Sequence, residues 1–227
     1  MRLVLEPTTY LWLALLGGIL GLDIASWAQA MISRPIVAGP AAGLLLGDPE
    51  AGFWAGALLE VLSLHQLPVG ASRYWDTGPA AVAATAAFVP GGGSVALLVA
   101  VGFGVIVGWL GSWSVHATRY LSARLVALEA PGTVTPASLT ARHLAAMASD
   151  LLRAAALTFL AVWAFPRLAA GLADVPRLGD AVAAIILLVS ASLMLGVDVR
   201  TIAWGGRVWA AFGAGAALSA ILALCLR

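Results

Sequence analysis

The stretch RPIVAGPAAGLLLGDPEAGFWAGALLEVLSLHQLPVGASRYWDTGPAAVAA, residues 34–84, decides the fold of this chain. It is apolar enough for a membrane, yet proline and glycine divide it into pieces shorter than the about 20 helical residues that cross a bilayer core. Helices are expected at Pro35 to Leu46, Ala51 to Leu64 and Thr77 to Val89. Irregular backbone at membrane depth survives only inside protein or beside water, so broken helices with ionisable residues between them predict a transport site.

The composition is that of an integral membrane protein. Of the 227 residues, 62% are hydrophobic and 10% are charged, and the mean hydropathy is +0.99. A soluble domain is about half apolar and about a quarter charged. The net charge of +1 comes without a basic run, which excludes a nucleic-acid partner, and the single cysteine, Cys225, excludes a disulfide within the chain. The expected fold is all-α: a polytopic transmembrane helical bundle with short, broken or re-entrant helices in its N-terminal half.

Longer apolar stretches are expected to span the bilayer. The first is read as a retained helix and not as a signal peptide, and its glycines favour close helix contact. Gly104, Gly108 and Gly111 predict a second small-residue interface, and Asp150 and Arg153 are spaced for an ion pair on one helix face. The expected spans are Tyr10 to Ile32, Ser94 to Val115, Leu144 to Phe165, Asp180 to Val197 and Trp204 to Leu226.

One membrane domain, residues 1–227, is expected. Residues 1–115 hold the broken helices and the site, residues 116–143 form a polar connecting loop, and residues 144–227 form the C-terminal helices. The arginines of the loop predict that it lies on the cytoplasmic side.

Glu60 is the first candidate for the site. Its sequence neighbours are apolar, so an ionised carboxylate there is costly unless it meets water or partners. The structural alternatives are a water-exposed helix end or a pair with Arg73. Asp76 directly precedes a short apolar helix, where Asp76 or Thr77 is expected to cap the helix, to lie beside a polar ligand, or both.

Four other polar residues are weighed in the same way. Asp23 lies within the first expected span and needs a partner, either for function or for interhelical hydrogen bonding. Asp48 follows a glycine and precedes a proline, which predicts a helix N-cap. Gln29 is a further polar side chain of the first span, and His65 has no second ligand at metal spacing, so no metal site is expected.

The same stretch carries a family resemblance. It reads Arg-Pro, a short apolar run to Leu-Gly-Asp, then Gly-x-x-x-Gly-x-x-Leu-Glu, then Gly-Ala and an Asp before an Ala-rich helix. It resembles the membrane subunit IIC of the mannose/fructose/sorbose type of sugar phosphotransferase system. His143 and Arg153 also look like their counterparts in that family. The residues that carry the main match are Arg34, Pro35, Leu46, Gly47, Asp48, Leu59, Glu60, Gly70, Ala71 and Asp76.

The resemblance implies a sugar-translocating subunit. It implies a hexose-like sugar, a membrane partner IID, cytoplasmic partners IIA and IIB, an oligomer, and a place in the bacterial inner membrane with several crossings. The phosphohistidine would lie on partner subunits, so this chain is expected to transport without catalysing, and no cofactor is expected. The substrate-binding residues expected are Glu60, Asp76, Gln29, His65 and Asp23. The alternatives are a regulatory or sensing membrane subunit, and an ion-coupled carrier in which the acids titrate.

Overall fold

The computed structural model describes residues 5–24, 26–64, 66, 73–127, 135–171 and 179–202. Within these ranges the regular structure is helical throughout, which confirms the expected all-α class. His65, Gly70, Ala71, Cys225 and the expected span Trp204 to Leu226 lie outside the described residues. The helices are α1 (Pro7–Asp23), α2 (Pro35–Leu46), α3 (Pro49–Ser63), α4 (Thr77–Phe88), α5 (Gly93–Ala127), α6 (Pro136–Gly171) and α7 (Asp180–Ile202).

Helices α2 and α3 form a tight hairpin that packs against α4. Gly47 ends α2 with a φ of +80°, and Asp48 begins α3 by accepting a hydrogen bond from the backbone N–H of Ala51 at 2.9 Å. A side chain at Gly39 would overlap the carbonyl oxygen of Gly52, so the two helices touch backbone to backbone. The breaks predicted from proline and glycine are confirmed, as is the N-cap role of Asp48.

Helix α4 is the core of the fold. Each of its residues from Thr77 to Phe88 is buried, and the helix contacts α1, α2, α3, α5 and α6. A helix made mostly of alanine and glycine lets neighbouring helices approach closely. Side chains added at Gly104 or Gly108 of α5 would meet Ala80 of α4, which confirms the small-residue interface predicted for that face.

Helix α1 lies against α6. Side chains added at Gly17 and Gly21 would overlap Thr158 and Ala154, so the predicted close contact of this helix is confirmed. The predicted span Tyr10 to Ile32 is wrong at its C-terminal end, because α1 ends at Asp23 and the chain then turns. The reason is the Asp23 carboxylate, which accepts hydrogen bonds from backbone N–H groups further along the same segment.

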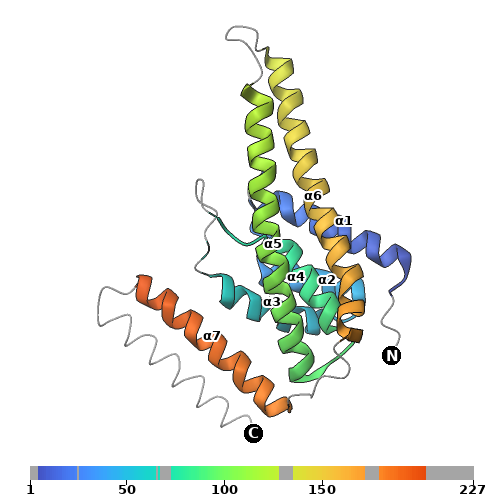
Figure 1. The fold of residues 1–227 in the computed structure, drawn as a ribbon, viewed down its shortest axis with the longest axis vertical. Helices are drawn as coiled ribbons and strands as arrows, with labels where there is room; N and C mark the ends of the chain where they lie inside the picture. The colour runs from blue at the N-terminus through green and yellow to red at the C-terminus, as the bar shows by residue number, and fades with distance from the viewer. Residues whose placement is uncertain are drawn as a thin grey trace.

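Helices α5 and α6 are the longest elements, with 35 and 36 residues. At 1.5 Å per residue each is about 50 Å long, compared with about 30 Å for the bilayer core. They run side by side and project together beyond the other helices (Figure 1). The polar loop predicted at 116–143 is therefore mostly helix, because α5 continues to Ala127 and α6 begins at Pro136.

Two helical stretches of the described chain are long and apolar enough to cross a membrane, Gly93–Arg124 and Pro136–Phe165. They contain the predicted spans Ser94 to Val115 and Leu144 to Phe165. Helix α7 begins at Asp180, as predicted, and packs on α3 and α5. It lies at the end of the molecule opposite the projecting ends of α5 and α6 (Figure 1). Shorter apolar helices are Pro35–Leu46, Thr77–Phe88 and Asp180–Met194.

Candidate functional site

The segment after α1 is held in shape by Asp23. This side chain is 2% exposed, and its two carboxylate oxygens accept hydrogen bonds from the backbone N–H groups of Ala30 at 2.6 Å and Ser33 at 3.0 Å. Ala28, Gln29 and Met31 have φ values of 64°, 51° and 62°. Residues other than glycine rarely adopt positive φ. The carboxylate therefore holds a strained loop, here called the Asp23 loop (residues 24 and 26–33).

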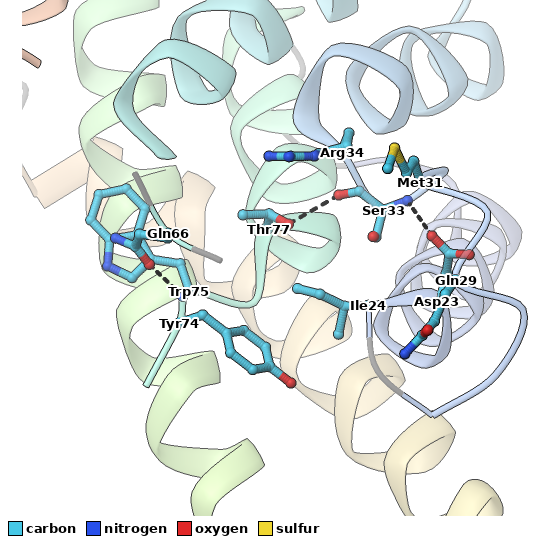
Figure 2. A pocket seen from close by; sticks show the side chains of 10 residues that line it. All are labelled: Asp23, Ile24, Gln29, Met31, Ser33, Arg34, Gln66, Tyr74, Trp75 and Thr77. Atoms are coloured by element: carbon cyan, nitrogen blue, oxygen red, sulfur yellow. Dashed lines mark hydrogen bonds between the residues drawn. The ribbon is translucent and has the colours of Figure 1, made fainter. Parts of the chain in front are cut away.

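A cavity of about 300 Å³ lies between the Asp23 loop and the residues around the start of α4 (Figure 2). The two sides are joined where the Thr77 hydroxyl donates to the carbonyl oxygen of Ser33 at 3.1 Å. On the far side, the side-chain oxygen of Gln66 accepts a hydrogen bond from the Trp75 N–H at 2.6 Å. The lining residues are Asp23, Ile24, Gln29, Met31, Ser33, Arg34, Gln66, Tyr74, Trp75 and Thr77.

The lining combines amide and hydroxyl side chains with one carboxylate, one guanidinium and two aromatic rings. Amides and hydroxyls both donate and accept hydrogen bonds, as sugar hydroxyls do. Small-molecule pockets typically hold a few such polar groups on a largely apolar and aromatic wall. The arrangement suits an uncharged, polyhydroxylated molecule.

Glu60 lies behind the cavity wall. One carboxylate oxygen is 3.3 Å from Nη1 of Arg34, and the other accepts a hydrogen bond from the Ile36 N–H at 3.4 Å. Arg34 lines the cavity and Glu60 is absent from the lining. The carboxylate therefore ties α3 to the start of α2 and orients a cavity residue. Its ionic partner is Arg34, whereas the structural alternative considered from the sequence was Arg73.

Asp76 is completely buried and also absent from the cavity lining. Its Oδ2 accepts a hydrogen bond from Nη1 of Arg153 at 2.6 Å, and its Oδ1 has no hydrogen-bond partner among the residues that the structure describes. Asp76 occupies the N-cap position of α4, but its side chain makes no capping hydrogen bond, so that part of the prediction is wrong. The carboxylate is drawn instead to a buried cation.

Arg153 also contacts two other groups. It donates to the hydroxyl of Ser114 at 3.0 Å, and its Nε lies 3.6 Å from Oδ1 of Asp150, which confirms the predicted ion pair on α6. Asp150 in turn accepts hydrogen bonds from the hydroxyls of Ser26 and Thr118. One cation thus links two carboxylates from α4 and α6 in a site that is largely removed from water.

The segment before α4 is fixed to α5 by aromatic and backbone contacts. Arg73 stacks over the ring of Trp113 at 4.1 Å, and Arg119 donates to the hydroxyl of Tyr74 at 2.9 Å. The Asp76 N–H donates to the carbonyl oxygen of Gly108 at 3.1 Å. These contacts place Tyr74 and Trp75 on the cavity wall.

The structure brings together some of the predicted site residues and not others. Asp23 and Gln29 line the cavity, Glu60 and Asp76 lie outside its lining, and His65 lies outside the described residues. The sequence prediction missed Ser33 and Tyr74 as cavity residues. The available signal was their position in the two non-helical segments that directly precede α2 and α4. A polar side chain there is free to face a ligand because it is not part of a packed helix face.

Comparison with known proteins gives a family and solved structures of similar fold. A model of the family described as the sorbose-specific IIC component of the PTS system matches residues 8–175. No curated protein matches the chain. A solved structure described as "Structure of membrane protein" is similar with a TM-score of 0.75 and 16% sequence identity, over 98% of this chain and 92% of that one. At that identity the likeness shows the fold alone.

Proposed function

We propose, since the chain belongs to the family of sorbose-specific IIC components of the sugar phosphotransferase system, that its cavity beside the Asp23 loop binds a hexose-like sugar. The family is the membrane-embedded sugar transport component of that system, of the mannose type. The observation that carries the proposal is the cavity itself, because it lies at the helix breaks and is lined by amides, hydroxyls and aromatic rings.

Some residues would touch the sugar, and others would hold those sugar-binding residues in place. Gln29, Gln66 and Thr77 would exchange hydrogen bonds with sugar hydroxyls, and the ring of Trp75 would pack on an apolar sugar face. Asp23 would act through the loop that carries Gln29. Glu60 would act through Arg34, and Asp76 through the start of α4.

Phosphorylation is assigned to a partner. Within the proposal, a IIB subunit charged through IIA carries the phosphohistidine, and a IID subunit completes the path through the membrane. The chain would then lie in a bacterial inner membrane with several crossings, as part of an oligomer. The two long apolar helices support the membrane assignment.

Sugar binding by the purified complex with IID tests the proposal. A panel of hexoses and amino sugars would be titrated against the unaltered complex and against Gln29→Ala and Trp75→Leu. Loss of one neutral hydrogen bond should weaken binding by about two- to tenfold for Gln29→Ala. Trp54→Leu is the matched control, because Trp54 lies on α3 with 51% of its surface exposed and does not line the cavity. If all three variants bind sugar as tightly as the unaltered complex, the cavity is not the sugar-binding site.

A further inference from the structure

One helical turn of α6 is connected to both sides of the cavity. Asp150 accepts a hydrogen bond from Ser26 of the Asp23 loop, and Arg153 donates to Asp76 at the start of α4. The two α6 residues are themselves paired at 3.6 Å. Helix α6 does not line the cavity, yet a single turn of this helix holds both sides of the cavity.

The two sides also meet directly. Thr77, which follows Asp76, donates to the carbonyl oxygen of Ser33, and the Ser33 N–H donates to Asp23 (Figure 2). The contacts form a closed circuit, which runs from α6 through the Asp23 loop to the start of α4 and back to α6. Displacing any member of such a circuit changes the separation of the two cavity sides.

Close packing makes the circuit stiff at Arg153. The Arg153 side chain is 9% exposed and that of Asp76 is 0% exposed. A side chain added at Gly111 of α5 would overlap Asp76, so the carboxylate has no room to move toward α5. A buried ion pair contributes little net stability compared with apolar residues of the same volume, and a specific geometry is one reason to retain it.

We propose that Arg153 is a positioning residue for the sugar cavity, which sets the separation of the Asp23 loop and the start of α4 without touching the sugar. The inference rests on the proposed function of the cavity. A guanidinium suits the task because its planar fork reaches several acceptors at once, here Asp76, Ser114 and Asp150. A lysine offers a single point charge that reaches fewer of them.

The variants are Arg153→Lys and the double variant Asp76→Asn/Arg153→Met, which removes the buried pair without leaving Asp76 as an unpaired charge. Arg167→Met is the control, because Arg167 lies exposed on the same helix, donates to the carbonyl oxygen of Trp163 and stacks over the ring of that residue. Each is combined with IID and measured for assembly by size-exclusion chromatography and for sugar affinity.

A third measurement, the labelling of a cysteine in the cavity, does not depend on the sugar. Ile24 lines the cavity, so Ile24→Cys in a Cys225→Ser background reports access to the cavity through its rate of reaction with a maleimide. Arg153→Lys and the double variant should assemble, react with maleimide several-fold faster and bind sugar about tenfold more weakly, which corresponds to about 1.4 kcal/mol. Arg167→Met should match the unaltered protein in all three measurements.

The outcomes separate the two proposals. An unaltered complex that binds none of the sugars contradicts the proposed function, while faster labelling of the Arg153 variants would still support the positioning role. Labelling and affinity that stay at the unaltered values in assembled variants would overturn the positioning role alone. Failure of both variants to assemble would also overturn it, because Arg153 would then be part of the general scaffold.

Discussion

Replacing Asp23 with asparagine should open the Asp23 loop and weaken sugar binding. Three residues of the loop have positive φ, and the left-handed conformation costs about 1–2 kcal/mol for each, or about 3–6 kcal/mol in total. The two hydrogen bonds to the Asp23 carboxylate are worth about 1.5–3 kcal/mol each, again about 3–6 kcal/mol. The strain and the hydrogen bonds nearly balance, so the loop should be sensitive to the loss of one bond.

Asparagine keeps one acceptor oxygen and turns the second into a donor that faces the N–H of Ser33 or Ala30. A loss of about 2 kcal/mol should raise the apparent Kd for sugar by up to about thirtyfold, because only the closed loop presents Gln29 to the cavity. Adding Ala28→Gly should recover about 1 kcal/mol, since glycine adopts positive φ freely.

Isothermal titration of sugar into the purified complex measures both effects, and the unfolding temperature reports stability. Asp48→Asn is the matched control, because Asp48 also accepts a backbone hydrogen bond but at the turn between α2 and α3. It should lower stability by about 1 kcal/mol or less and leave affinity unchanged. Unchanged affinity in Asp23→Asn, or no recovery with Ala28→Gly, would refute the balance of strain and hydrogen bonds described above.

Three further predictions concern packing, charge and energy source. Gly111→Ala should sharply reduce the yield of assembled complex, because the added methyl group would overlap Asp76. Gly102→Ala is the control and should leave the yield unchanged, because its methyl group would meet no atom of the described residues within 4 Å. Glu60→Gln should abolish or strongly weaken sugar binding while assembly persists, since Arg34 loses its ionic partner at the cavity wall; normal affinity would separate Glu60 from the site. Sugar uptake should need phosphoenolpyruvate and ignore an uncoupler, and the reverse result would favour an ion-coupled carrier.

The ends of the short helices could be predicted from the sequence because they depend on local chemistry. Gly47 and Asp48 form a C-cap and an N-cap by backbone conformation and a hydrogen bond three residues away, and neither needs tertiary context. The small-residue faces were also readable, since a glycine repeat on a helix permits close packing whichever partner occupies it. The family resemblance rested on the same breaks, and the family match over residues 8–175 confirms it.

The site was harder to predict because its residues interact with residues far away in the sequence. Nothing near Asp76 identifies Arg153 as its partner, since 77 residues separate them. The predicted span from Tyr10 extends too far for a similar reason. The residues after Asp23 are apolar enough to continue a span, and only the hydrogen bonds of the Asp23 carboxylate with backbone N–H groups turn them into a loop. Helix periodicity carries no information about such contacts.

The distribution of charge around the cavity also bears on what it binds. Each carboxylate near it has a partner: Glu60 is paired with Arg34, Asp76 and Asp150 share Arg153, and Asp23 accepts hydrogen bonds from two backbone N–H groups. A charged ligand would have to displace one of these partners and leave a charge unpaired in a poorly solvated site, which is costly. A neutral sugar makes no such demand, because its hydroxyls can exchange hydrogen bonds with the amide and hydroxyl side chains while the ionic pairs stay intact. Charge compensation therefore favours an uncharged substrate.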